Sequence, residues 1–389
     1  MHMALDAREL CGHPTGVGRY LASLLEAWQR AGTPHRITLY APAMPEWAER
    51  ACAMESARGP REDSESSSAA ARARGGGAPR AAIDVRIIPG RPGTWWEQVQ
   101  FPRALAAEPP DVLFAPAYTA PLRTRVPIVL TIHDLSFAAH PEWFAPREGL
   151  RRRWLTRQSA RHAAAVITVS EFSRQEVLTR YGLPETQVHA IHSGLPRVAT
   201  AAAGAATAED QEPLVLYSGS LFNRRHVPDL IRAFARVAAE RPAARLIIVG
   251  DDRSHPPQPL EPLIASLGLS PQVTLRRYVP DEELAQLYRR ARVFAFLSEY
   301  EGFGFTPLEA LQAGVPIVVA DTPVAREIYG EAAVFVKVGD VAGCAVALAR
   351  LLDDEGAREG VLARAPAVLA RYSWEKAAAE TLRAIEHAV

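Results

Sequence analysis

Short apolar segments of the kind that form buried parallel strands recur along this chain, and helical patterns alternate with them. The alternation runs from residue 2 to residue 192 and begins again at residue 214. Such a pattern is typical of doubly wound α/β sheets. At 389 residues the chain also exceeds the size at which one hydrophobic core stops growing. We therefore predict two Rossmann-like domains with parallel sheets that face an interdomain cleft.

The pattern also predicts where each element lies. Strands are expected at 2–6, 35–40, 84–88, 111–115, 128–132, 166–169, 188–192, 214–218, 246–249, 273–276, 293–297, 317–320 and 333–336. Helices are expected at 19–29, 96–107, 146–163, 171–181, 228–241, 260–267, 282–290, 308–313, 341–352, 357–370 and 374–388. The predicted domain plan is a first domain at 1–196, a linker at 197–213, a second domain at 214–370, and a final segment at 371–389 whose helix crosses back to the first domain.

One stretch interrupts the first domain. Residues 54–82 are rich in Ser, Ala, Arg and Gly and have no apolar periodicity. Such a segment cannot bury enough surface to offset the entropy of ordering it. We predict a disordered insertion.

Charge and cysteine content narrow the classes of function. Lys+Arg and Asp+Glu both number 44, so no overall field favours nucleic acid and anion recognition must be local. The three cysteines are far apart, which argues against a disulfide framework or a zinc site and fits a reducing compartment. No apolar run reaches the roughly 18 residues of a membrane span. We expect a cytoplasmic protein.

Residues 298–309 read Ser-Glu-Tyr-Glu-Gly-Phe-Gly-Phe-Thr-Pro-Leu-Glu and join an expected strand to an expected helix. The two glycines allow close approach to a ligand, and N–H groups at a helix start can hold an anion. The stretch therefore suggests a phosphate-bearing ligand. Thr306 and Glu309 also have the spacing of a capping box, in which Glu309 would only satisfy amides of its own helix. Both interpretations stay open on these residues alone.

Two more strand ends carry polar side chains. The strand expected at 214–218 is followed by Gly219-Ser-Leu-Phe-Asn-Arg-Arg-His226 and a new helix. Two guanidinium groups beside a helix N-terminus suit a diphosphate, although a solvated arginine pair would show the same pattern. The strand expected at 128–132 ends in His133-Asp134. A hydrogen-bonding histidine fits better there than a metal ligand, because no third ligand follows at the usual spacing.

Together these segments resemble the family 4 retaining glycosyltransferases, which belong to the group 1 glycosyltransferases and have the GT-B fold. Glu301-Gly-Phe-Gly-Phe-Thr-Pro-Leu-Glu309 is similar to the family's E-x7-E motif. Other segments similar to the family, in the same order, are Thr15-Gly-Val-Gly-Arg-Tyr20, Trp96-Glu-Gln98, Thr131-Ile-His-Asp134, Ser170-Glu-Phe-Ser173, residues 219–226 and Trp374-Glu-Lys376. The resemblance spans nearly the whole chain outside the insertion and the linker.

The resemblance implies roles for individual residues. Glu301 would face the donor sugar and the departing phosphate, Glu309 would hold ribose hydroxyls, and His133 would contact the sugar from the first domain. The implied catalytic residues are Glu301, His133 and Arg225. The implied donor-binding residues are Gly16, Gly219, Ser220, Arg224, Arg225, Tyr278, Val279, Phe303, Gly304, Phe305 and Glu309. Arg225 and Ser220 depart from the family, because many members have Lys at the first position and some have Arg at the second.

The implied reaction moves a hexosyl group from a GDP- or UDP-linked sugar to a saccharide or lipid-linked acceptor, with no metal ion and no cofactor. A mannosyl group from GDP-mannose is slightly favoured, because several segments look most like members that build cell-surface polysaccharide. In the family, retention is usually attributed to front-face attack, in which the leaving phosphate takes the proton of the acceptor. The alternatives are a nucleotide-sugar-binding protein without turnover and a nucleotide-sugar 2-epimerase of GT-B fold.

The basic helix at 147–163 leaves a further question open. Its arginines suit contact with anionic lipid at the inner face of a membrane, or with a lipid-linked acceptor. A solvated helix face would have the same composition.

Overall fold

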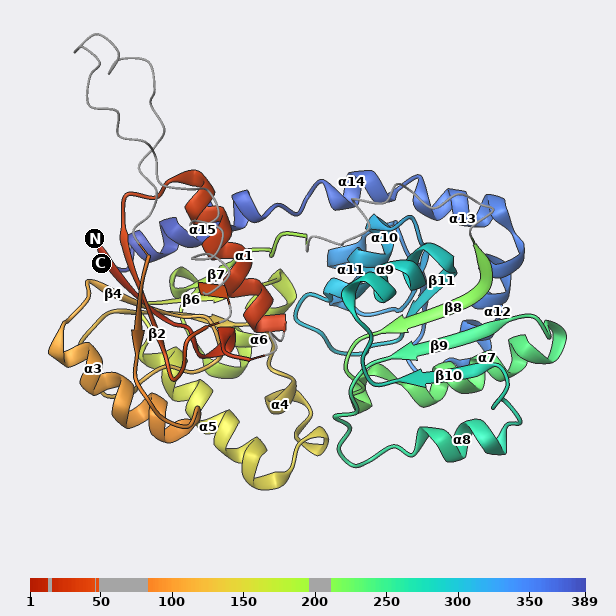
Figure 1. Cartoon of the computed structure of the whole chain (residues 1–389), viewed down its shortest axis with the longest axis horizontal. Coiled ribbons are helices and arrows are strands. Elements are labelled where there is room, and N and C mark those ends of the chain that lie inside the picture. Colours follow the sequence, from red (N-terminus) through yellow and green to blue (C-terminus); the bar gives the residue numbers. More distant parts are fainter. Residues whose placement is uncertain (13–15, 46, 49–82, 196–210) are drawn as a thin grey trace, which may run out of the picture.

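The computed structural model describes residues 1–12, 16–45, 47–48, 83–195 and 211–389. Figure 1 shows two lobes lying side by side, each built around one sheet. The first lobe contains the sheet from the N-terminal half of the chain together with the C-terminal helix, and the second lobe contains the other sheet. Both sheets are parallel throughout, which confirms the predicted α/β class.

The first sheet has the strand order β3-β2-β1-β4-β5-β6-β7. Its strands are β1 His2–Asp6, β2 Arg36–Ala41, β3 Ile83–Ile87, β4 Val112–Ala115, β5 Ile128–Ile132, β6 Ala165–Thr168 and β7 Val188–Ala190. The α-helices of this half are α1 Gly16–Ala31, α3 Phe101–Ala107, α4 Ser136–Ala139, α5 Pro146–His162 and α6 Glu171–Tyr181. Shorter helical turns lie at Arg8–Leu10, Trp96–Gln100, Pro141–Trp143 and Glu185–Gln187, the second of them π-helical.

The second sheet has the strand order β10-β9-β8-β11-β12-β13. Its strands are β8 Glu212–Ser218, β9 Arg245–Val249, β10 Val273–Arg276, β11 Ala291–Phe296, β12 Ile317–Ala320 and β13 Val334–Val336. Its helices are α7 Val227–Glu240, α8 Leu260–Ser266, α9 Asp281–Arg290, α10 Phe305–Gln312, α11 Pro323–Tyr329, α12 Val341–Asp353, α13 Glu355–Leu362 and α14 Ala365–Leu369. A 3-10 turn lies at Asn223–Arg225, and α15 at Trp374–Glu386 is the last of the helices described.

Strand β1 shows why these strands are apolar at nearly every position. Met3 and Leu5 pack into one hydrophobic core together with α1, whereas Ala4 packs into a second core that contains Trp96. Successive side chains of a strand point to opposite faces of its sheet. A strand that helices cover on both faces therefore needs apolar residues throughout.

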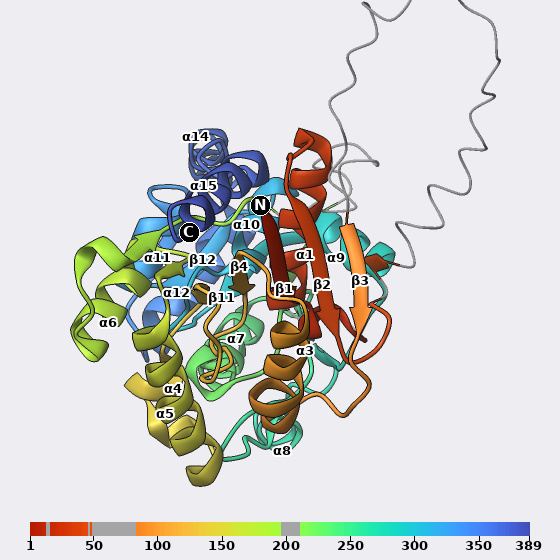
Figure 2. The same cartoon turned by 90° about the vertical axis from the view of Figure 1, so that its left-hand side faces the viewer.

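The C-terminal helix belongs structurally to the first lobe. The chain crosses from α14 to α15 along one side of the molecule in Figure 1, and α15 packs against α1. The indole N–H of Trp28 on α1 donates to the backbone oxygen of Ala378 on α15 at 2.9 Å. Figure 2 shows that the N- and C-termini lie at the same end of the protein. The last helix thus completes the core that the first helix begins.

The helix predictions need correction at two places. The helix predicted at 357–370 is two helices, α13 and α14, with a break at residues 363–364. Pro366 lies in the first turn of α14, where a proline is tolerated, whereas within a continuous helix it would remove a hydrogen bond and clash with the preceding turn. Helix α11 was not predicted. Thr322 caps it by accepting from the amide of Ala325, and Pro323 is its first residue.

Two other predictions concern segments that the structure describes partly or not at all. The predicted insertion at 54–82 lies outside the described residues, as does most of the predicted linker. At the end of that linker, β8 begins at Glu212 and not at residue 214.

Candidate active site

Glu301 and two arginines form a largely buried cluster at the carboxyl ends of β8 and β11. Arg225 donates from Nε to Oε1 of Glu301 at 2.9 Å, and Arg224 Nε lies 3.7 Å from the same oxygen. Ser298 donates its hydroxyl to that oxygen as well, at 2.9 Å. The second lobe therefore holds one carboxylate and two guanidinium groups in fixed positions, where ligands of open parallel sheets bind.

The carboxylate and the guanidinium groups of this cluster stabilise one another's charged forms. Burial opposes ionisation of Glu301, but Arg225 and Arg224 hold the pKa of its carboxyl below the ordinary value. Burial likewise disfavours the charged form of Arg225, yet Glu301 raises the pKa of Arg225 overall. The Arg225 guanidinium also lies over the rings of Phe222 and Phe296, at 5.4 and 4.9 Å from their centroids. Both groups are consequently ionised at neutral pH.

The glycine at position 219 makes room for Arg225. Gly219 has φ +136°, and a Cβ there would meet the Arg225 Nη1 nitrogen at 2.7 Å. The same nitrogen donates to the backbone oxygen of Ser220 at 2.6 Å. The basic loop thus binds Arg225 through its own backbone, and Ser220 contributes a carbonyl group to that contact.

His133 meets the cluster from the first lobe. The backbone oxygen of His133 lies against Gly302, where a Cβ atom would overlap it. On the ring, Nε2 is 2.8 Å from the carbonyl oxygen of Pro116, and since a carbonyl only accepts, Nε2 carries the proton. Burial lowers the pKa of His133, so the ring is neutral and Nδ1 is an acceptor.

Arg224 connects the two lobes through charge. Its Nη1 donates to the hydroxyl of Ser136 at 3.3 Å, and its guanidinium holds the pKa of Asp134 below the ordinary value although burial acts in the opposite direction. Asp134 also accepts from the backbone and hydroxyl of Ser136, at 2.9 and 2.7 Å. The arginine therefore lies between carboxylates of both lobes, Asp134 and Glu301.

Glu309 occupies a separate buried position on α10. Its Oε2 accepts from the hydroxyl of Tyr288 at 3.2 Å, and Arg19 of the first lobe approaches Oε1 to 3.6 Å. Burial raises the pKa of Glu309. Because Arg19 is more than half exposed, this ion pair is weak and open to displacement by a ligand.

The capping-box interpretation of residues 306–309 is wrong. Helix α10 begins at Phe305 after Gly304, whose φ is +86°, and no side chain caps the helix. Thr306 therefore lies inside the first turn, and its buried hydroxyl has no hydrogen-bond partner among the described residues. The amides at the start of α10 remain available to a ligand. A glycine in the left-handed region sets the start of this helix, two residues earlier than Thr306 would as a cap.

The other predicted residues lie as follows. Phe303 is buried and packs against Tyr372 and Phe305, so only its backbone is free for ligand contact. Tyr278 is exposed and Val279 buried just after β10, at the edge of the sheet and two strands from β8. Gly16 is the first residue of α1, and a Cβ there would meet no atom within 4 Å. The structure thus brings His133, Arg224, Arg225 and Glu301 together, and places Tyr278, Val279 and Gly16 further out.

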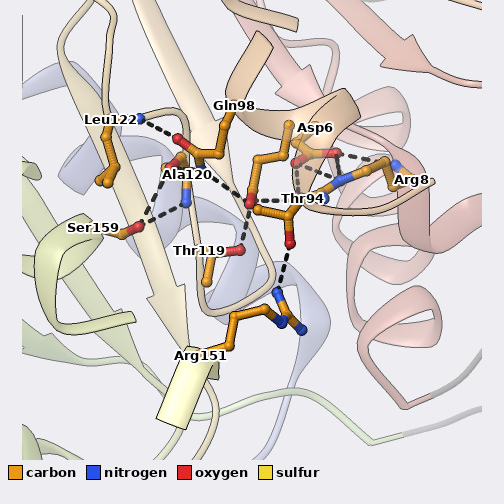
Figure 3. Close-up of polar contacts among 10 residues, drawn as sticks. Asp6, Arg8, Thr94, Gln98, Thr119, Ala120, Leu122, Arg151 and Ser159 are labelled. Atoms are coloured by element: carbon orange, nitrogen blue, oxygen red, sulfur yellow. Dashed lines mark hydrogen bonds and ion pairs between the residues drawn. The ribbon is translucent and has the colours of Figure 1, made fainter. Parts of the chain in front are cut away.

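A second charged network lies at the carboxyl end of β1, drawn in Figure 3. Arg8 donates to both carboxylate oxygens of Asp6 and, at 2.7 Å, to Glu97. Thr119 and Gln98 also donate to Glu97, at 2.5 and 3.1 Å. Although burial opposes it, the two carboxylates raise the pKa of Arg8, which stays charged. This network joins the segment after β1 to the turn at Trp96–Gln100 and to Thr119 after β4.

Sequence reasoning singled out none of Asp6, Arg8, Arg19 or Tyr288 as site residues. Arg19 directly follows Gly16-Val-Gly18, so its position in the sequence could have indicated that it lies near the site. The role of Tyr288 depends on how α9 packs against the second sheet, for which the sequence carries no local signal.

Within the described ranges, no group of three or more His, Cys, Asp and Glu side chains is arranged to hold a metal ion. No helix of those ranges has both the length and the apolar character needed to cross a bilayer.

Comparison with known solved structures identifies the fold. Anabaena HepE, solved with UDP and glucose, superposes with a TM-score of 0.71 over 100% of both chains at 18% identity. WaaG, a glycosyltransferase involved in lipopolysaccharide biosynthesis, superposes with a TM-score of 0.69 over 99% of both chains at 15% identity. These similarities, with the two parallel sheets, establish the GT-B fold.

Sequence comparison identifies the family. The model described as "Glycosyltransferase Family 4" matches residues 14–197, and that of "Glycosyl transferases group 1" matches residues 199–366. The chain is 28% identical over 266 residues to O-antigen chain mannosyltransferase B of Escherichia coli, covering 66% of this chain and 69% of that protein. It is 31% identical over 280 residues to the MMP alpha-(1->4)-mannosyltransferase of Mycolicibacterium hassiacum, covering 68% of this chain and 66% of that protein. The chain belongs to the group 1, family 4 glycosyltransferases.

Proposed function

We propose that the protein transfers a hexosyl group from a nucleotide sugar to a saccharide or lipid-linked acceptor, with retention at the anomeric carbon. The observation that carries this proposal is one of the contacts between the lobes, in which the backbone of His133 in the first lobe packs against Gly302, next to the Arg225–Glu301 pair of the second. Fixed cations on one side and a neutral histidine on the other suit a substrate with a charged leaving group and a polar sugar.

The leaving diphosphate has suitable partners in the second lobe. Departure of the nucleotide develops negative charge on the phosphate, and preorganised cations and amides stabilise such charge. Arg224 and Arg225 supply the cations, and the uncapped start of α10 supplies amides. We infer that these groups, without a metal ion, provide the electrostatic stabilisation.

The nucleoside and the sugar would be held by different groups. Glu309, buried and only weakly paired with Arg19, can accept hydrogen bonds from ribose hydroxyls. His133, whose Nδ1 is an acceptor, can bind a hydroxyl of the donor sugar from the opposite lobe. For the proton of the acceptor we propose the departing phosphate as base, which gives front-face attack and retention.

The donor sugar is proposed to be mannose carried by GDP, because both curated relatives compared above are mannosyltransferases. A panel of GDP- and UDP-linked sugars with saccharide and lipid-linked acceptors tests the proposal, with anomeric configuration read by NMR and a parallel series in chelator. Retained products and turnover that survives the chelator are expected. Absence of both transfer and donor hydrolysis across the panel would overturn it.

The same panel separates the alternatives. A binding protein without turnover would show calorimetric donor binding and no product. A 2-epimerase would convert UDP-N-acetylglucosamine with no acceptor present. Inversion at the anomeric carbon would leave a transferase but remove the retaining mechanism.

We further propose that the first lobe contacts an anionic membrane surface. Trp95, Leu150 and Trp154 are 69, 62 and 57% exposed, and Arg151 donates to Thr94 at 2.8 Å, which ties the Trp95 loop to α5. The outward face of α5 also carries exposed arginines at positions 147, 151, 157 and 161. Aromatic side chains among arginines favour the interface of an anionic bilayer.

A further inference from the structure

Glu327 on α11 of the second lobe caps a helix of the first lobe. Its Oε1 accepts from the backbone N–H of Glu171 at 2.7 Å, and its Oε2 accepts from the backbone N–H of Phe172 at 2.9 Å. These are the first two residues of α6, which has 11 residues. Ser170 accepts from the third amide, that of Ser173, at 3.0 Å. The whole first turn of α6 is therefore satisfied, two of its donors by a carboxylate from the other lobe.

The capped turn also holds His133. The hydroxyl of Ser173 donates to the backbone oxygen of His133 at 3.0 Å. That oxygen is the atom against which Gly302 of the second lobe packs. A continuous set of contacts thus runs from Glu327 through the start of α6 to His133 and returns to the second lobe at Gly302.

Two more contacts fix the same geometry. His192, in the segment after β7, places Nε2 2.7 Å from Oε1 of Glu327. Tyr300, adjacent to Glu301, donates its hydroxyl to Glu176 on α6 at 2.9 Å and packs on Phe172 with ring centroids 5.4 Å apart. Helix α6 is consequently held at its end and along its side by residues of the second lobe.

We propose that Glu327 is a positioning residue, which aligns His133 with the Arg225–Glu301 pair by capping α6 across the interface between the lobes. The expected effect on kcat rests on the proposed transferase function. Glu327 itself touches neither of the reacting groups; it acts through Ser173 and His133. Donor binding, which we assign mainly to the second lobe, depends little on Glu327.

The kinetic test uses the full chain with the donor found in the panel. Glu327→Ala should lower kcat by up to about 10²-fold, the cost of an ångström-scale misplacement, with the donor Kd changed less than about threefold. Glu327→Gln, which keeps one acceptor oxygen, should recover part of that loss. Asp321→Asn, which removes an exposed carboxylate two residues before α11, is the matched control and should keep wild-type kcat.

A double-variant series separates positioning from general damage. In a His133→Ala background, adding Glu327→Ala should lower kcat less than about threefold further, because the residue acts through His133. A full additional loss there, or unchanged kcat in Glu327→Ala alone, would overturn the proposal.

Hydrogen exchange gives a readout that is independent of activity. Amides of Glu171 and Phe172 should be protected in the wild type and in Asp321→Asn, and should exchange at least tenfold faster in Glu327→Ala. If the wild type shows no turnover but these amides behave as expected, the proposed function fails while the cap stands. Unprotected amides in the wild type would remove the cap itself.

Discussion

Gly302 and His133 make backbone contact across the interface between the two lobes, and a Cβ at position 302 would overlap the His133 carbonyl oxygen. We predict that Gly302→Ala separates the lobes at this point and lowers kcat by about 10²-fold. The donor Kd should change little. Steady-state kinetics and calorimetry check both quantities. Gly360→Ala is the control, since a Cβ there meets no atom within 4 Å; equal kinetic losses in the two variants would contradict the prediction.

Arg225 makes two contacts that a lysine cannot reproduce together. Its Nε donates to Glu301 and its Nη1 donates to the Ser220 carbonyl, in the fixed fork of a guanidinium. Although many family members have Lys here, Arg225→Lys should lower kcat by about tenfold, equivalent to one lost charge-assisted hydrogen bond of about 1.4 kcal/mol. Transfer rates measured at saturating donor test this, and wild-type turnover in the variant would refute it.

Removing the charge of Glu301 should destabilise the fold, because two largely buried guanidinium groups would lose their shared partner. We expect Glu301→Gln to lower the free energy of unfolding by about 3 kcal/mol. Denaturant titration measures it. Glu212→Gln, which breaks the exposed pair with Arg290, should cost less than about 1 kcal/mol and serves as the control. Similar losses of unfolding free energy in both variants would show that the Glu301 ion pairs stabilise the fold no more than an exposed pair does.

The effect of Glu301→Gln on the free energy of unfolding should depend on pH. The folded pKa of Glu301 lies below its ordinary value of 4.5, so its stabilising contribution is present above about pH 4.5 and is lost as pH falls through the folded pKa. The stability difference between wild type and Glu301→Gln should therefore shrink as the pH falls below about 4.5. Unfolding curves at several pH values measure it, and a difference that stays constant with pH would contradict the prediction.

The proposed membrane surface predicts selective binding to anionic vesicles. Wild-type protein should sediment with phosphatidylglycerol vesicles and not with phosphatidylcholine vesicles. Reversing Arg147 and Arg157 to Glu should weaken binding by tenfold or more, since each arginine contributes about 1 kcal/mol. Trp95→Ser with Trp154→Ser should weaken it as well. Val346→Ser, which changes an equally exposed apolar residue on α12, is the control. Lack of vesicle binding by the wild type would refute the proposed membrane contact.

The fold could be predicted largely from the sequence because both sheets are covered on both faces. The fully buried strands β5 and β12 are apolar except at Thr131 of β5, and their predicted bounds agree with the structure. Helix α6 was predicted with its observed bounds, because the Ser170 cap at its start is a local interaction. Where the start of a helix is set by a backbone conformation, as by Gly304 before α10, side-chain capping rules failed.

The geometry of the site could be predicted only in part. His133, Arg225 and Glu301 each follow a strand. The topology of parallel sheets was therefore enough to place them at the carboxyl ends of the strands. Their contacts across the lobes depend on packing between distant segments. Glu327 illustrates the limit, since nothing local to residues 323–329 indicates that a carboxylate there reaches the amides of α6.

Because α15 packs against α1, the core of the first lobe can be completed only after the end of the chain has been synthesised. The strands of the first sheet leave the ribosome first, but Trp28 of α1 meets its partner, the Ala378 carbonyl, only when the last helix has been made. Domains generally fold as units in the order of their synthesis. Here the first lobe must wait for the second, so that a chain stopped before residue 374 would leave the face of α1 uncovered and prone to aggregation.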